Sequence, residues 1–364
     1  MKNNKLFVLN IFARIGKTPL SSNASEALLS DLVDKLEIKI EKLKIKLFVY
    51  YIYNFFSQTK LFFFSNSFVD LKCNKIVFSS TSIKFLRDFI YFLQVILKII
   101  HNPRSTSFFY NLNRLQLYIL FLLRFLRLDI NLIQADGYLL SKEECKLFKK
   151  IIVFSRSTEI IYSSYNINNQ ILFSVPYINN LEFEYKPYFK LSNKKSIKIV
   201  HCGSISEYNL PEKNFKRIFE LCKDNNNIEL NFTTSQKDIP LYFRELINHF
   251  PTNIKFLGNL NNNDLDKLLK QSDFALDLRN NKNNLQSAID FPSKLFFYMK
   301  YNLFIFSTIS NSIPYEIASV LIPFDNLFNL DKIRFSEYAI NQLKVKKYLN
   351  NYSLDRVLIN ALKN

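Results

Sequence analysis

The second half of the chain alternates short apolar runs with longer amphipathic runs. Runs of four to eight apolar residues are typical of buried strands, whereas apolar residues recurring every third or fourth position are typical of helices. The pattern predicts strands at 197–202, 228–233, 254–258, 273–278 and 303–307, and helices at 212–224, 264–271 and from 293 onward. This alternation indicates a parallel sheet whose ligand lies at the carboxyl ends of the strands.

The first half shows the same alternation of strand and helix patterns, which predicts a separate α/β domain. It opens with a strand at 6–13, a polar loop and a helix at 24–36. Further strands are predicted at 61–64, 75–78, 107–110, 130–134 and 151–154, and strongly apolar helices at 85–100 and 115–128. We therefore expect an N-terminal domain at 1–178, a linker at 179–195, a second domain at 196–343, and a basic helix at 344–364 that could cross back to the first domain.

The two apolar helices of the first half admit two interpretations. Their longest uncharged runs, 89–97 and 115–123, have nine residues each, and a membrane span needs about 20. They are then either buried core helices or a basic, apolar surface that rests on an anionic membrane.

Composition narrows the function classes. The net charge is +18, and residues 1–176 carry 24 Lys and Arg against 12 Asp and Glu, so they hold +12 of it. Lys outnumbers Arg by 37 to 12 while Gly and Trp are scarce, which is typical of an AT-rich genome. Because no nucleic-acid-binding motif accompanies the charge, we do not expect a nucleic-acid partner.

The cysteines and the first residues indicate a cytosolic protein. The four cysteines are far apart, without CxxC spacing and with few histidines nearby, so reduced thiols and no zinc site are expected. The apolar run at 6–13 has no cleavage site after it, and we interpret it as a buried strand rather than a signal peptide. Location in the cytoplasm, including the inner face of the plasma membrane, is the expectation.

Only four glycines occur, and each follows a predicted strand: Gly16, Gly137, Gly203 and Gly258. Glycine is the residue that tolerates positive φ and close approach of a ligand to the backbone. Each position is therefore a tight turn or a ligand-facing loop.

The segment 291–299, Phe-Pro-Ser-Lys-Leu-Phe-Phe-Tyr-Met, carries the most specific signal. With Asn-Ile-Lys-Phe-Leu-Gly at 253–258, Ser-Asp-Phe-Ala-Leu at 272–276 and Phe-Ile-Phe-Ser at 304–307, it resembles the donor-binding domain of family 4 (group 1) glycosyltransferases. The resemblance implies the α/β GT-B fold, with two Rossmann-like domains whose parallel sheets face each other across a cleft. It also implies a retaining transferase without metal or other cofactor, which moves a sugar from a nucleotide diphosphate sugar to a glycan or lipid-linked hydroxyl in surface polysaccharide assembly.

The resemblance places the donor in the C-terminal domain. The implied donor-binding residues are Gly203, Ser204, Lys213, Gly258, Asp290, Ser293 and Lys294. Lys294 begins a helix, so its charge would add to the positive end of the helix dipole beside a diphosphate. The alternative for Lys294 and Lys213 is a solvated surface lysine.

The acceptor side would use the loops at Gly16 and Gly137. Asp136 is the candidate general base if the enzyme inverts configuration; otherwise it caps a turn. Asp273 and Asp277 are spaced along one strand and do not predict a metal site.

Three positions depart from the family pattern. Phe297 stands where the family has a glutamate, and its partner position is Ile289, so the E-x7-E pair is absent and only Asp290 lies nearby. Ser204 replaces the usual arginine. The competing hypothesis is therefore a catalytically degenerate GT-B protein that binds nucleotide or serves as a scaffold.

Overall fold

The computed structural model describes most of the chain, with several gaps. The described residues are 7–14, 45–53, 67–70, 75–79, 84–101, 105–112, 114–126, 128–134, 139–175, 196–234, 239–247, 249–280, 293–308, 313 and 315–363. They belong to two compact units: unit 1 comprises Met1–Tyr177 and Tyr352–Asn364, and unit 2 comprises Ile178–Asn351.

Unit 1 is built on an eight-stranded sheet in the order β3-β4-β2-β1-β5-β6-β7-β8. Every neighbouring pair is parallel except β3 with β4 at the edge. Its strands are β1 Phe7–Arg14, β2 Ile45–Tyr53, β3 Ser67–Asp70, β4 Lys75–Ser79, β5 Thr106–Tyr110, β6 Ile130–Gln134, β7 Lys150–Val153 and β8 Gln170–Phe173. Its helices are α2 Lys84–His101, α3 Arg114–Leu122, the 3-10 turn η1 Arg124–Leu126, α4 Lys142–Cys145, α5 Arg156–Ser164 and α13 Leu354–Lys363.

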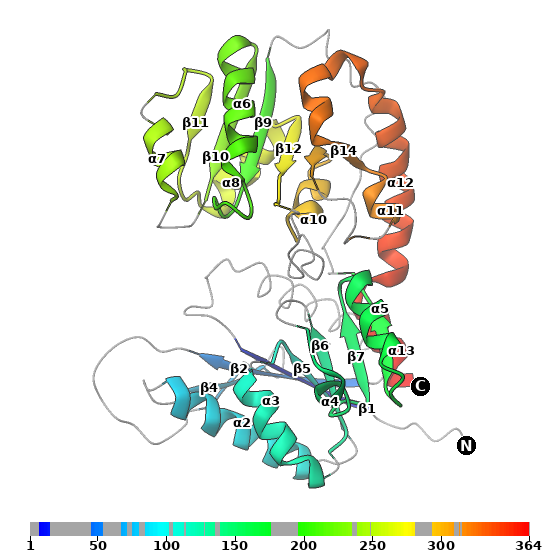
Figure 1. Ribbon diagram of the computed structural model, residues 1–364. Coiled ribbons are helices and arrows are strands. Elements are labelled where there is room, and N and C mark those ends of the chain that lie inside the picture. The colour runs from blue at the N-terminus through cyan, green and yellow to red at the C-terminus, as the bar shows by residue number, and fades with distance from the viewer. Residues whose placement is uncertain are drawn as a thin grey trace. The chain divides into compact units, whose positions relative to one another are not determined.

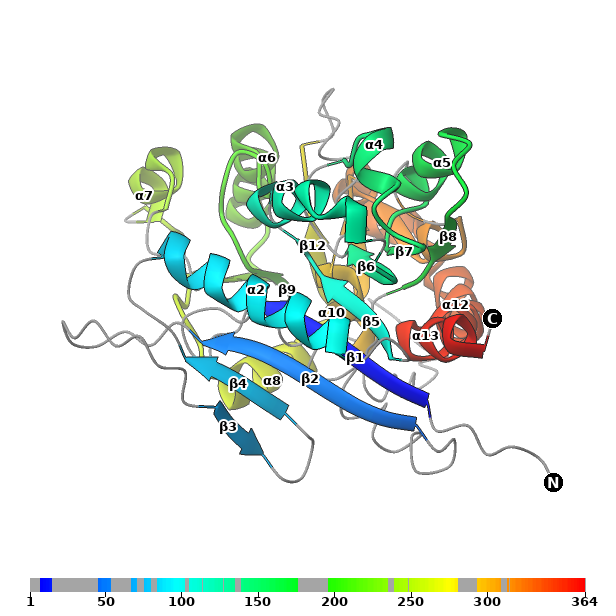
Figure 2. The same cartoon turned by 90° about the horizontal axis from the view of Figure 1, so that it is seen from below.

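Helices α2, α3 and α5 cover one face of this sheet (Figure 2). Alternate strand residues point to them, among them Phe109 on β5, Leu132 on β6 and Ile151 on β7. This alternation is the period of two expected of strands. The predicted apolar helices are therefore core helices along their inner faces.

Unit 2 is an all-parallel, six-stranded sheet in the order β11-β10-β9-β12-β13-β14. Its strands are β9 Ile197–Cys202, β10 Ile228–Thr233, β11 Ile254–Phe256, β12 Phe274–Asp277, β13 Phe304–Ser307 and β14 Leu321–Pro323. Its helices are α6 Glu212–Asp224, α7 Leu241–Ile247, α8 Asn262–Gln271, α10 Ser293–Lys300, α11 Tyr315–Ala318, the 3-10 segment η3 Phe324–Lys332, and α12 Phe335–Tyr352.

The strand order of unit 2 reverses between β9 and β12. Counted from β9, the order is third, second, first, fourth, fifth and sixth strand, so successive connections run in opposite directions from the β9–β12 boundary (Figure 1). Helices α6 and α7 pack on the face that carries Ile199, Leu230 and Phe274. A crevice at the carboxyl ends of the two central strands is the usual ligand position in sheets of this kind.

Two predicted helices end or begin elsewhere in the structure. The helix predicted at 115–128 ends at Leu122 and is followed by the 3-10 turn η1, in which Phe125 is exposed. The helix predicted from 344 begins at Phe335 as α12 and is followed by a separate α13. Gln342 is buried although it is polar, and its Nε2 donates to the Leu303 carbonyl at 3.3 Å. A polar residue at a core-facing position interrupts the apolar periodicity by which the start of the helix would be predicted.

The structure contains four strands that the sequence pattern did not predict: the antiparallel edge strand β3 and the strands β2, β8 and β14. The helix predicted at 24–36, the strand at 61–64 and the linker at 179–195 lie outside the described residues.

Candidate functional site

The candidate site lies in unit 2, where β9 and β12 end side by side at the reversal of strand order. Gly203 follows β9 directly and has φ +103°, a conformation that residues with a Cβ rarely adopt. Its N–H donates to the Thr233 carbonyl at 2.8 Å, so the chain is held in this conformation by the neighbouring strand.

Lys294, the second residue of α10, packs against this glycine. A Cβ at position 203 would lie 2.7 Å from Lys294 Cε and 3.3 Å from its Nζ. The side chain as a whole is partly exposed, yet its Nζ is buried and has no hydrogen-bond partner in the described part of the structure. A buried ammonium with unused donors is costly unless an anion normally completes it.

The electrostatics of Lys294 follow from this burial. Desolvation lowers the pKa of Lys294 to about 8; the Asp277 carboxylate acts in the opposite direction, and the Arg279 guanidinium adds to the lowering. At neutral pH the group is still mainly protonated. It is therefore a cation that gains from a second negative charge.

Asp277 and Arg279 form a buried ion pair at the end of β12. Arg279 Nε lies 3.4 Å from Asp277 Oδ1, and the two residues are 8% and 0% exposed, in the order Arg279 and Asp277. Neither Asp277 oxygen has a hydrogen-bond partner among the described residues, and the same holds for Arg279 Nε. With Lys294, the cluster holds two cations and one carboxylate.

The backbone that carries Arg279 is anchored on both sides. Its carbonyl accepts a hydrogen bond of 2.7 Å from Thr308 Oγ1, and the next N–H, of Asn280, donates to the Tyr208 carbonyl at 2.7 Å. Asp277 and Arg279 are not among the donor-binding residues that the family resemblance implies. An aspartate and an arginine at the end of an apolar strand were the signal for them.

Helix α10 is fixed to β9 through Tyr298. The Cys202 N–H donates to Tyr298 Oη at 2.8 Å, and the tyrosine is fully buried. On β9 itself, burial lowers the pKa of His201 to about 3, so this imidazole is neutral. Lys294 therefore reaches the end of β9 from a helix that is hydrogen-bonded to the same strand.

The other predicted donor residues lie in different settings. Gly258 has φ +60°, but a Cβ there would meet nothing within 4 Å, and its carbonyl accepts from Thr233 Oγ1 at 2.8 Å. Lys213 is exposed in the first turn of α6, and Ser204 follows Gly203, partly buried. Of the predicted donor residues, the structure thus brings Gly203 and Lys294 together.

Several predicted site residues have no described position. Gly16, Asp136, Gly137 and Asp290 lie outside the described residues, as does the side chain of Ser293 at the start of α10. Among the residues that are described, no group of three or more His, Cys, Asp or Glu could hold a metal ion.

Phe297, at the position where the family has glutamate, is partly buried on α10. Its ring packs edge-on against Tyr301 with centroids 5.6 Å apart, and Tyr301 Oη donates to Asp266 at 2.9 Å. The position serves an aromatic contact along the helix in this chain.

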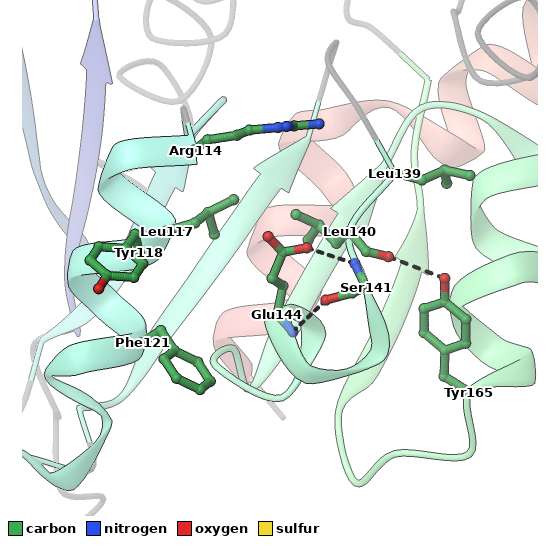
Figure 3. Close-up of a pocket in the computed structure, with 9 residues that line it drawn as sticks. All are labelled: Arg114, Leu117, Tyr118, Phe121, Leu139, Leu140, Ser141, Glu144 and Tyr165. Carbon is green, nitrogen blue, oxygen red and sulfur yellow. Dashed lines mark hydrogen bonds between the residues drawn. The ribbon is translucent and has the colours of Figure 1, made fainter.

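Unit 1 contains a separate pocket of about 490 Å³ between α3 and the segment that leads into α4 (Figure 3). Three of its polar side chains are engaged within the protein. Ser141 and Glu144 form the capping box of α4, and Tyr165 Oη donates to the Leu140 carbonyl at 3.1 Å. The pocket is therefore a mainly apolar groove.

None of the helices that the structure describes is long and apolar enough to cross a membrane. The three cysteines in the described part, Cys145, Cys202 and Cys222, are free and buried. Cys73 lies outside it.

Similarity to known proteins is found at the level of the fold. No protein-family model matches the chain, and no curated protein matches it. The structure is similar to a glycosyltransferase from Rickettsia africae, with TM-score 0.65 and 12% identity over 98% of this chain and 97% of that one. It is similar to an α,α-trehalose-phosphate synthase (UDP-forming) from Burkholderia vietnamiensis, with TM-score 0.65 and 10% identity over 99% and 100%.

A third similar structure is an E. coli protein chain described as "Trehalose-6-phosphate from E. coli bound with UDP-2-fluoro glucose". The TM-score is 0.63, and the identity is 9% over 98% of this chain and 99% of that one. These identities show the fold and leave the reaction open. The predicted fold class is confirmed: the chain has two α/β units with parallel sheets and is similar to glycosyltransferases of the GT-B fold.

Proposed function

We propose that the protein is a glycosyltransferase that takes its sugar from a nucleotide diphosphate sugar bound at the carboxyl ends of β9 and β12. The observation that carries the proposal is the buried Lys294 Nζ, which lacks a hydrogen-bond partner among the described residues and packs against the positive-φ Gly203. A diphosphate has the charge and the acceptor oxygens that such an ammonium lacks.

The same arrangement has a chemical use. When the bond between the sugar and the diphosphate breaks, negative charge develops on the leaving phosphate. Lys294 is already positioned and desolvated, so its charge would stabilise the leaving group without a costly rearrangement. The N-terminus of α10 adds partial positive charge on the same side.

The acceptor and the stereochemistry are proposals that rest on the family resemblance. We propose a glycan or lipid-linked hydroxyl as acceptor, retention of configuration, and a place in surface polysaccharide assembly. Asp136 is the proposed base only for the inverting alternative. Asp290, Gly258, Ser204 and Lys213 stay proposed donor contacts, and Gly16 and Gly137 stay proposed acceptor-side loops.

Donor binding is tested by a thermal-shift screen of nucleotide diphosphate sugars, since a ligand that binds only the native state raises its stability. We expect at least one donor to raise the melting temperature, and Lys294→Ala to weaken its binding by roughly 1.5–3 kcal/mol. Lys300→Ala is the matched control, because Lys300 lies exposed on the same helix. If no nucleotide sugar or nucleoside diphosphate binds the wild type, the proposal is wrong.

The second candidate is a degenerate GT-B protein that binds nucleotide without turnover. Phe297 favours it, because its ring is engaged with Tyr301 where the family has a carboxylate. Release of nucleoside diphosphate in the presence of lipid-linked or glycan acceptors separates the two. Binding without release in every acceptor mixture would support the scaffold.

A further inference from the structure

The buried charges at the end of β12 are not balanced within the cluster. Lys294 and Arg279 carry two positive charges, and Asp277 supplies one negative charge. Removing charges from water is expensive, and an uncompensated buried charge destabilises a protein. A cluster with one excess positive charge is therefore suited to an anionic ligand.

The hydrogen-bonding groups point to the same conclusion. Lys294 Nζ and Arg279 Nε are both buried and lack hydrogen-bond partners in the part of the chain that the structure describes. The Arg279 side chain is only 9% exposed, and the separation of 3.4 Å from Asp277 leaves its Nε without a true hydrogen bond. An ammonium and a guanidinium N–H, neither with a hydrogen-bond partner among the described residues, thus lie near the end of β12.

We infer that Arg279 is a second diphosphate-binding cation that acts together with Lys294, and that Asp277 is the positioning residue that holds its guanidinium. The inference rests on the proposed function and names a residue for the same site. An ammonium serves as a point charge, whereas a guanidinium donates two parallel hydrogen bonds to one phosphate. Both cations would then act on the sugar-bearing phosphate, which a nucleoside monophosphate lacks.

The anchoring of Arg279 supports this role. Its carbonyl is held by Thr308 and the following N–H by Tyr208, while Asp277 constrains the guanidinium. A preorganised cation loses little freedom on binding, so more of its attraction contributes to affinity. Position 204, directly after the strand-end glycine, is a serine and offers no charge.

The experiment compares nucleoside diphosphates with their monophosphates by titration calorimetry. UDP, GDP, ADP and CDP are measured against the wild type, and the tightest is carried forward with its monophosphate. We expect Arg279→Gln to weaken the diphosphate by about 10- to 100-fold, with a much smaller effect on the monophosphate. Arg279→Lys keeps the charge without the fork and should lie between wild type and Arg279→Gln.

Arg334→Gln is the matched control, since Arg334 is an exposed arginine of the same unit. A purely structural role of Arg279 would lower the melting temperature and change both ligands alike, leaving the ratio of diphosphate to monophosphate affinity as in the wild type. If Arg279→Gln does not fold, the ratio measured for Arg279→Lys decides in the same way.

The outcomes separate this inference from the proposed function. If the wild type binds a diphosphate, Lys294→Ala weakens it and neither Arg279 variant changes the ratio, the role of Arg279 is refuted and the donor site stands. If no diphosphate binds the wild type, both proposals fail together.

Discussion

At the scale of single residues, the site depends on a glycine that leaves room for a lysine. Gly203 and Gly258 both have positive φ, but only Gly203 faces another side chain: a Cβ at this position would lie 2.7 Å from Lys294 Cε. The two glycines therefore form a natural pair of test and control. A positive φ is common to both, +103° at Gly203 and +60° at Gly258, and steric contact with Lys294 is specific to Gly203.

We predict that Gly203→Ala displaces Lys294 and weakens diphosphate binding by at least about tenfold, the loss of roughly one charge-assisted hydrogen bond. Both Gly203→Ala and Gly258→Ala should lower the free energy of unfolding by about 1–2 kcal/mol, because a Cβ at positive φ is strained. Calorimetric titration and thermal unfolding of the two variants check this. Equal effects on diphosphate affinity would show that the contact with Lys294 is unimportant.

A second residue-scale prediction concerns pH. The pKa of Lys294 is about 8 in the folded protein, so diphosphate affinity should fall about tenfold between pH 7 and pH 9 as the ammonium loses its proton. The neighbours do not titrate in this window: the pKa of His201 is about 3 and that of Cys202 about 12. A Kd that stays constant from pH 7 to 9 would contradict the role of Lys294.

Stability should change in the opposite direction over a higher pH range. Because burial depresses the pKa of Lys294 below its unfolded value near 10.5, the unfolded chain binds a proton that the folded chain lacks between pH 8 and 10.5. Stability therefore rises with pH in that window, by up to about 3 kcal/mol. The difference between wild type and Lys294→Met, from denaturant unfolding at each pH, isolates this contribution.

The sequence identified Gly203 and Lys294 because both lie in local motifs. Arg279 and Asp277 have no motif of their own, and their importance depends on α10 bringing Lys294 to the end of β12. Lys213 was selected because it follows the strand-end Gly203 at the position of a phosphate-binding lysine in the family. Its position in the sequence does not show whether it is exposed, and in the structure it lies on the surface. A site residue can be predicted from sequence when it lies in a local motif. A cluster of charges that forms across several elements cannot be predicted in this way.

At the scale of elements, the end of α3 and the turn η1 form an exposed apolar surface. Five side chains within nine positions are exposed: Tyr118, Phe121, Leu122, Phe125 and Leu126. The Arg124 guanidinium lies over the Phe121 ring, 4.7 Å from its centroid. Exposed apolar groups beside arginines have the composition of a surface that rests on an anionic membrane.

We predict that the protein co-sediments with vesicles that contain anionic lipid at low salt, and that the double change Leu122→Ser and Phe125→Ser reduces this binding several-fold. Apolar area that enters the headgroup region contributes about 25 cal/mol per Å². Ile160→Ser is the control, because Ile160 is an equally apolar side chain, 68% exposed, on a different helix, α5. Equal binding to neutral vesicles at high salt would rule out the electrostatic part.

Element prediction succeeded where one periodicity dominated. The strands at 197–202 and 228–233 and the helix at 212–224 have the predicted bounds. Prediction was wrong for 115–128, because an apolar sequence continues past Leu122 onto the surface. It was also wrong at α12, because the buried polar Gln342 interrupts the apolar pattern of a core-facing helix.

At the scale of the whole molecule, the last helix belongs to the first unit. Val175 N–H donates to the Tyr352 carbonyl at 2.8 Å, and the Phe173 and Tyr352 rings meet edge-on with centroids 5.7 Å apart. Lys150 Nζ also donates to the Ala361 carbonyl. The chain end therefore stabilises strands that lie far away in sequence.

We predict that Leu358→Ala destabilises unit 1 by about 2–5 kcal/mol, because Leu358 is fully buried on α13. Differential scanning calorimetry should show the transition of unit 1 moving down while nucleoside diphosphate affinity, which belongs to unit 2, is unchanged. Asn360→Ala, at an exposed position of the same helix, should have little effect. A large loss of diphosphate affinity in Leu358→Ala would contradict this division.

The sequence by itself determined the alternation of strands and helices, the parallel sheet of unit 2, and Gly203 and Lys294 as candidate donor contacts, because each depends on local periodicity or a short motif. Only the tertiary structure decided that β9 and β12 are adjacent, that α10 is tied to β9 through Tyr298, and that Asp277 and Arg279 join Lys294 in one buried cluster. The physical reason is that burial and charge balance are properties of elements brought together from distant parts of the chain.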